Sequence, residues 1–258
     1  MAQNHEFELT NTTGRFGGLG NLLQAEFSRW RTWDWYIMAI IWVAIISFST
    51  LGMIASTDTT ITDAILILGF MIGMFPVIAV VIIMQDEIVS HRETGTIAWL
   101  LSKPVKRSSF ILSKLIGNIV GVLISMVVIP GIVVYFEIVV FKGIILSPLH
   151  YMLGFTLVAI NLVFYLSLTL MLGTVFEQRG GIIAIPLTLC LGYSMLMNLA
   201  QIPIHPMSMF FAGGTDESLF GALILGTPLT SVLPIISTTL FIIVFILISL
   251  RQFNKEEL

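Results

Sequence analysis

Residues 91–110, HRETGTIAWLLSKPVKRSSF, separate two long apolar segments of the chain. The stretch begins and ends with polar residues, and most of its charged residues are Arg and Lys. Its centre, residues 97–101, is nevertheless as apolar as the segments on either side. Because a helix of two turns is not stable alone in water, this centre needs partners, and the surrounding segments decide what they are.

The composition predicts a protein that crosses the membrane several times. The chain has 258 residues, of which 57% are hydrophobic and 10% charged, and its mean hydropathy is +0.99. A soluble domain carries about 25% charged residues. The single cysteine, Cys190, excludes an internal disulfide and lies in an apolar run, where we expect a small buried side chain.

Charged residues bound six candidate transmembrane helices, so the predicted fold is an all-α polytopic membrane protein. A helix needs about 20 mostly apolar residues to cross a bilayer. The segments of that kind are about 35–54, 64–84, 115–136, 150–176, 181–200 and 231–250.

Lys and Arg predict the orientation of these spans, because cytoplasmic loops carry an excess of both. With six spans, the N-terminus, the 85–114 loop, the 176–180 turn and the C-terminus share one side. Of the 12 Lys and Arg residues only Lys142 falls on the opposite side; the others are Arg15, Arg29, Arg31, Arg92, Lys103, Lys106, Arg107, Lys114, Arg179, Arg251 and Lys255. We therefore expect a prokaryotic cell membrane protein with both termini in the cytoplasm.

Two further segments complete the predicted organisation. Residues 201–230 contain three Pro and four Gly, too broken for a span and too apolar for an exposed loop, which favours an outer re-entrant hairpin buried against protein. Before the first span, apolar residues recur at helical spacing over 19–30, which predicts an amphipathic helix on the inner membrane surface, its basic residues near anionic head groups. The domains are then 1–34 (cytoplasmic, with this helix), 35–250 (six spans) and 251–258 (cytoplasmic tail).

The opening stretch predicts a short cytoplasmic helix over about 96–102. Thr94 or Thr96 can cap its start, and Pro104 disfavours helical backbone at the residue before it. Ile97, Leu100 and Leu101 share one face and Trp99 points roughly opposite. A helix apolar on two sides needs two partners, one being its own membrane domain and the other a separate cytoplasmic protein. The alternative is a loop helix folded only under its own bundle.

The run from Glu87 through residues 92–107 to Lys114 resembles the signature of ABC-2 type permeases. An acidic residue leads to Gly-Thr, a short apolar helix, a Ser-x-Pro-Val-x-Arg motif and a lysine at the third span. The resemblance implies the membrane subunit of an ABC exporter, with 96–102 as the coupling helix that docks on an ATPase subunit. It implies two copies of that ATPase, a second permease chain, identical or related, and coupling residues at Glu93, Gly95, Thr96, Ile97, Trp99, Leu100, Leu101, Pro104 and Arg107.

The chain lacks the pattern for binding ATP itself. A P-loop needs a Gly-Lys pair to cradle phosphate, and none of the lysines follows a glycine. We therefore expect no enzymatic activity, bound cofactor or metal in this chain, and ATP and Mg in the partner ATPase. The expected partners are that ATPase, a permease chain and membrane lipids, and no nucleic acid.

Two rival functions stay open. Ser194 in the fifth span and His205 beyond it could form the Ser–His pair of an intramembrane protease, although the glycine of a hydrolase elbow is missing. A secondary transporter needs an ionisable residue at mid-membrane, and the candidate, Glu137, falls near the outer end of the third span.

Polar residues within the spans indicate where a substrate passes. Ser194, Asn198 and Gln201 share one helical face, and Asn118 and Ser125 are spaced by seven in the third span. The alternative is that they bond neighbouring helices. The spans otherwise carry apolar and aromatic groups, which favours an amphipathic or lipid-like substrate. Two G-x-x-x-G pairs, Gly69/Gly73 and Gly117/Gly121, are interpreted as close-packing sites.

Overall fold

The computed structural model describes residues 18–54, 60–93, 106–176, 178–196, 203–211 and 218–255. Within these residues every regular element is a helix. In chain order they are α1 (Leu19–Arg29), α2 (Trp33–Ile54), α3 (Ile61–Glu93), α5 (Arg107–Val122), the π-helical η1 (Leu123–Val128), α6 (Ile129–Lys142), α7 (Pro148–Val175), α8 (Arg179–Leu196), the 3₁₀ turn η2 (Pro206–Met209), α9 (Leu219–Leu225) and α10 (Leu233–Lys255).

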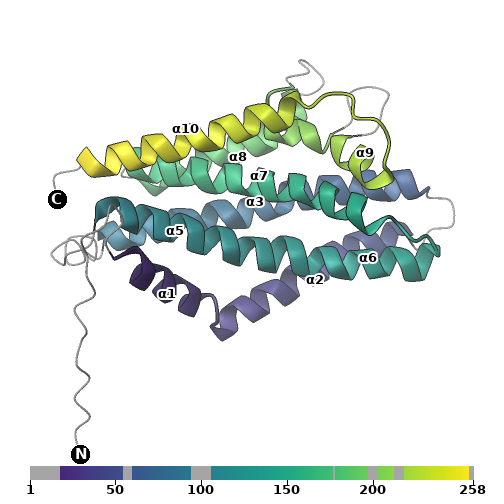
Figure 1. Cartoon of the computed structure of the whole chain (residues 1–258), viewed down its shortest axis with the longest axis horizontal. Helices are drawn as coiled ribbons and strands as arrows, with labels where there is room; N and C mark the ends of the chain where they lie inside the picture. The colour runs from purple at the N-terminus through teal and green to yellow at the C-terminus, as the bar shows by residue number, and fades with distance from the viewer. Residues whose placement is uncertain are drawn as a thin grey trace, which may run out of the picture.

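The long helices run side by side, with α1 and α2 forming a V at one edge (Figure 1). Five candidate spans are long and apolar enough to cross a membrane: Trp35–Gly52, Ile61–Glu87, Arg107–Lys142 (α5, η1 and α6 together), Pro148–Val175 and Leu233–Lys255. The expected span 181–200 corresponds to α8, whose apolar part, Arg179–Tyr193, is shorter. Since 197–202 lie outside the described residues, six spans stay a prediction.

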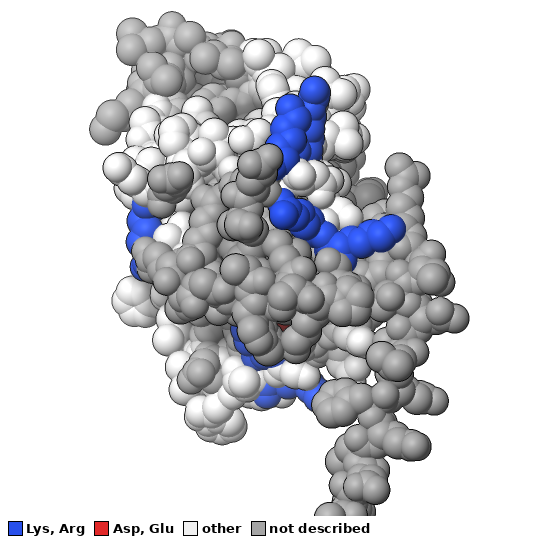
Figure 2. Space-filling model, turned by 90° about the vertical axis from the view of Figure 1, so that its left-hand side faces the viewer, with Lys and Arg blue, Asp and Glu red and all other residues white. Residues whose placement is uncertain are grey.

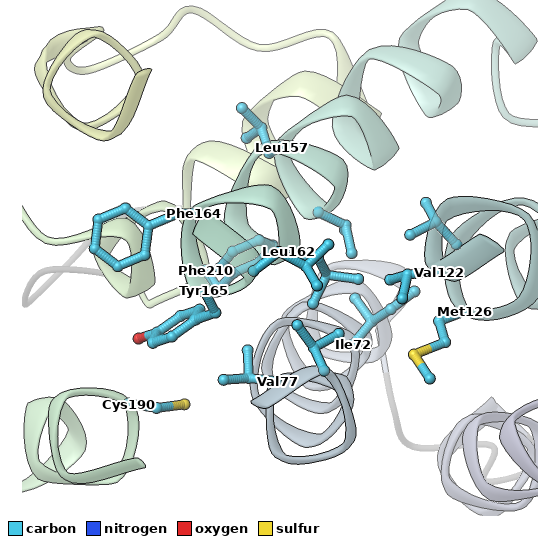
Figure 3. Packing of buried hydrophobic residues seen from close by; sticks show 14 of the residues in the cluster. Ile72, Val77, Val122, Met126, Leu157, Leu162, Phe164, Tyr165, Cys190 and Phe210 are labelled. Atoms are coloured by element: carbon cyan, nitrogen blue, oxygen red, sulfur yellow. The ribbon is translucent and has the colours of Figure 1, made fainter. Parts of the chain in front are cut away.

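The core of the bundle forms around α7, which packs against α3, α8, α9 and α10. Figure 3 shows Leu162 and Tyr165 of α7 facing Ile72 and Val77 of α3, with Cys190 of α8 beside them. Cys190 is 1% exposed, so its predicted burial is confirmed. Many large apolar side chains on α2, α6 and α10 are exposed, as expected for helices that face lipid or another chain.

Helices α3 and α5 reach beyond the expected span boundaries. The sequence placed a loop over 85–114, whereas α3 continues to Glu93 and α5 begins at Arg107. Residues 85–93 contain no Gly or Pro to stop a helix, so the polar end of α3 stays helical. Lys114 therefore lies inside α5 and not before the span.

One end of the bundle, the basic end, gathers the end of α3, the starts of α5 and α8, α1 and the C-terminus (Figure 1). Among the described residues it carries Arg29, Arg31, Lys106, Arg107, Lys114, Arg179, Arg251 and Lys255, whereas Lys142 ends α6 at the opposite end. Figure 2 views the basic end and shows several Lys and Arg side chains on its surface. This segregation of charge follows the expected pattern.

The expected outer hairpin contributes η2, which packs against α7 and α10, and α9, which packs against α3 and α7. Phe210 and Phe220 are buried against α3, where a methyl group added to Gly73 or Gly69 would lie 2.7 or 2.8 Å from their rings. The close-packing interpretation of this glycine pair is therefore confirmed. Two acidic residues within this predicted hairpin, Asp216 and Glu217, lie outside the described residues.

Candidate coupling site at the basic end

The amphipathic helix predicted over 19–30 is present as α1, and it packs along α5. Glu26 lies over Gly117, where an added methyl group would be 2.7 Å from its Cβ atom, and the Trp30 ring occupies the space beside Gly121. This glycine pair is also a close-packing site, as interpreted. The absence of side chains at the two glycines lets α1 approach α5 closely.

This approach brings an acidic residue of α1 to a basic residue of α5. Lys114 Nζ lies 2.7 Å from Glu26 Oε1 and 2.7 Å from Glu87 Oε2 of α3. Arg29 forms ion pairs with Glu26, at 3.3 Å, and with Glu87. The four side chains form a cluster of two cations and two anions that joins α1, α3 and α5, which we call the charge cluster.

The charge cluster is largely shielded from solvent. The side chains of Lys114, Glu26 and Glu87 are 8%, 9% and 12% exposed, and that of Arg29 is 30% exposed. Burial lowers the pKa of the Arg29 guanidinium, and the carboxylates of Glu26 and Asp86 oppose that shift. A guanidinium normally stays protonated far above neutral pH, so Arg29 enters the charge cluster as a cation. Each buried charge thus depends on its partners, since an uncompensated one costs several kcal/mol, about 3–5.

Asn118 belongs to the same site. Arg29 Nη2 donates to Asn118 Oδ1 at 3.0 Å, and Asn118 Nδ2 donates to the Lys114 carbonyl oxygen at 2.8 Å. Ser125, also predicted along the substrate path, is buried and donates to the carbonyl of Gly121 in its own helix at 2.8 Å. A pathway role for either residue stays a prediction.

Most predicted coupling residues lie outside the described residues: Gly95, Thr96, Ile97, Trp99, Leu100, Leu101 and Pro104. The two that remain flank this segment, since Glu93 ends α3 and Arg107 begins α5. Of the other pathway residues, Asn198 and Gln201 are not described, and Ser194 lies in α8 without a described side chain.

The residues of the rival functions have structural contacts. His205 stacks on Tyr193, and its Nδ1 atom accepts a hydrogen bond from the Met207 N–H at 3.2 Å. Glu137 of α6 accepts from the Thr50 hydroxyl of α2 at 3.0 Å. The His205–Tyr193 stacking joins the start of η2 to α8, and the Glu137–Thr50 hydrogen bond joins α6 to α2.

Sequence reasoning missed the meeting of Glu26, Arg29, Glu87 and Lys114, although a signal was present. On the amphipathic helix, Glu26 follows Leu19, Leu22 and Leu23 on the same face, which places a carboxylate on an apolar surface. Such a group needs a buried cation. The expectation that both arginines of this helix meet lipid head groups was wrong for Arg29, because it turns into the charge cluster.

A comparison with family models matches residues 38–258 to the ABC-2 family transporter proteins. The chain belongs to the ABC-2 transporter family. This ABC-2 chain is thus a component of a membrane transport system, and its helices fit a membrane location. A comparison with curated proteins finds no match.

Proposed function

We propose that this chain is the permease subunit of an ABC transporter that exports an amphipathic or lipid-like substrate. Two copies of a separate ATPase subunit hydrolyse ATP, and two permease chains, identical or related, form the transmembrane path. Family membership supports the permease role. The apolar core of the bundle, with few buried charges away from the basic end, supports the substrate class.

The charge cluster is the observation that supports energy coupling. Glu87 lies six residues before the end of α3, and Lys114 lies seven residues after the start of α5. At 1.5 Å per residue each of the two residues lies about 10 Å along its helix from the end that leads into residues 94–105. Their ion pair ties α3 to α5 at this level, and Glu26 and Arg29 add α1 to the same unit.

This arrangement gives an ATPase a rigid place to act. Force applied to residues 94–105 reaches α3 and α5 through the chain itself, and the charge cluster keeps these helices and α1 together. Because buried ion pairs resist separation of single partners, the three helices respond as one body. A movement of residues 94–105 driven by the ATPase thereby moves the spans formed by α3 and α5 together.

The test is recovery of the ATPase with the purified permease. The tagged chain is extracted from its native membrane in mild detergent, and co-purified proteins are identified and counted by mass spectrometry. Leu100→Asp places a charge in the face predicted to enter the ATPase, and an unpaired buried charge costs about 3–5 kcal/mol. We expect at least a hundredfold weaker ATPase binding and no transport, with normal amounts of permease in the membrane.

Trp99→Ala is the matched control, because Trp99 is predicted on the opposite side of the same helix. It should lower stability in detergent and retain ATPase binding. Normal ATPase recovery by the Leu100→Asp protein would overturn the proposal. Transport that follows an ion gradient without any ATPase would establish a secondary transporter instead.

A further inference from the structure

Helices α1 and α2 form a V that opens toward α5 and η1 (Figure 1). Side chains of these four helices line a groove within the V. Its volume is about 590 Å³, within the range of about 300–1,000 Å³ found for small-molecule sites. We call it the elbow groove, and its main lining residues are Phe27, Arg31, Tyr36, Ala39, Val120 and Ile124.

The lining of the elbow groove changes in character along its length. Arg31 and Tyr36 lie near the turn between α1 and α2, where tyrosine and tryptophan rings mark the boundary between head groups and hydrocarbon. From there the groove follows α5 and η1 past Val120 and Ile124 to Ile129 at the start of α6, roughly 14 Å of helix. The end near the turn is therefore cationic and aromatic, and the α1 wall adds the polar side chains of Gln24 and Ser28. Apart from Ser125, the part along Val120, Ile124 and Ile129 is apolar, so the groove offers a polar end and an apolar end as a phospholipid does.

The two arginines of this region differ in what they bind. Arg29 is held by Glu26 and Glu87 in the charge cluster, whereas Arg31 is exposed and forms no ion pair with the described residues. An exposed arginine at the membrane boundary attracts an anionic head group. The guanidinium can also donate two parallel hydrogen bonds to a phosphate.

The position of the elbow groove favours lipid over a protein partner. Its rim residues Tyr36 and Ile124 are 55% and 51% exposed, and they belong to helices that pass through the membrane. Within a membrane such a surface faces lipid or another chain, and the cationic end beside an apolar wall is complementary to lipid. A second copy of this chain would have to bring an acidic group to Arg31 and an apolar side chain to Ile124 together.

We propose that the elbow groove binds one anionic phospholipid from the leaflet at the basic end. The phosphate pairs with Arg31, and one acyl chain lies along Val120, Ile124 and Ile129. The bound lipid fills the space between α1, α2 and α5 and so supports the position of α1. The site does not depend on the proposed function, since it needs no ATPase and no transport.

Native mass spectrometry of the purified full-length protein tests the site. The probes are phosphatidylglycerol and phosphatidylcholine with identical acyl chains. The wild-type protein should retain one phosphatidylglycerol in preference to phosphatidylcholine. Arg31→Gln should weaken phosphatidylglycerol binding about five-fold and leave phosphatidylcholine unaffected. Arg251→Gln removes an exposed arginine of α10 at the same end and should change neither.

A second variant tests the acyl-chain part. Val120→Trp fills the apolar part of the elbow groove and should reduce binding of both lipids, whereas Leu247→Trp, on the exposed face of α10, should not. A phosphatidylglycerol with a photoreactive acyl chain should label peptides containing Val120 to Ile129. Equal effects of Arg31→Gln and Arg251→Gln, labelling elsewhere, or retention of lipid only by pairs of chains would overturn the proposal.

Discussion

Two glycine pairs with the same spacing receive very different neighbours. Gly69 and Gly73 of α3 accept the rings of Phe220 and Phe210, so this contact consists of apolar surfaces alone. Gly117 and Gly121 of α5 accept Glu26 and Trp30 of α1, and the carboxylate of Glu26 then depends on Lys114 and Arg29. The first contact needs only shape, whereas the second also needs balanced charge.

The difference shows which part of the molecule loses most stability when a single side chain is changed. Aromatic packing responds to volume, and it is lost gradually as cavities or clashes appear. The stability of a buried group of two cations and two anions falls when one charge is removed, because the remaining three charges do not cancel. The basic end is therefore the sensitive end.

Removing Lys114 should have the largest effect. Lys114→Met leaves Glu26 and Glu87 with one cation between them, and we expect a loss of about 3–5 kcal/mol in the free energy of unfolding. Reversible unfolding in mixed micelles measures the loss, and protease cleavage near residues 18–32 reports release of α1.

The double variant Lys114→Met with Glu26→Met is the control for this prediction. It removes one cation and one anion and leaves Arg29 paired with Glu87. Most of the stability should return, since a buried ion pair replaced by apolar groups is often neutral. A double variant as unstable as the single one would show that charge balance is not what holds α1.

Adding a methyl group to each glycine pair should have an intermediate effect. Gly121→Ala forces the Trp30 ring away from α5, and Gly73→Ala presses on Phe210. Each should cost about 1–3 kcal/mol, as overpacking typically does. Proteolysis should distinguish them, with release of α1 only in Gly121→Ala. Gly52→Ala has open space around it and should cost nothing. Release of α1 by Gly73→Ala would contradict the independence of the two contacts.

The smallest difference concerns two fully buried asparagines. Asn161 donates to the Gly73 carbonyl at 2.8 Å while its own Oδ1 has no partner among the described residues, so Asn161→Leu should cost less than about 1 kcal/mol. Asn118 accepts from charged Arg29, so Asn118→Leu should cost more, about 1.5–3 kcal/mol. Denaturant titration of both variants measures the difference in the free energy of unfolding. Equal losses would show that the charge of Arg29 does not strengthen its hydrogen bond to Asn118.

The sequence predicted the elements whose causes are local. Apolar runs bounded by charge predicted the five candidate spans that the described residues contain, and the spacing of leucines predicted the amphipathic helix. The end of α3 was placed too early, because polar residues mark the edge of the membrane and not the end of a helix.

The charge cluster was beyond reach for a different reason. Glu26, Glu87 and Lys114 each have an ordinary explanation when considered alone, and they come from segments far apart in the chain. Only the packing of α1 across Gly117 and Gly121 determines that their charges meet. The signal that could have been used, a carboxylate on an apolar helical face, indicates that a partner exists without indicating which one.

Helix α3 is continuous from Ile61 to Glu93 and so connects the two ends of the bundle mechanically. At 1.5 Å per residue its 33 residues extend about 50 Å, well beyond a hydrocarbon core of about 30 Å. Its C-terminal part carries Glu87 at the basic end, and its N-terminal part carries Gly69, which contacts the ring of Phe220. A rigid tilt of α3 would move Glu93 and Gly69 in opposite directions, and Pro76 lies between them at the kind of residue where helices most often kink.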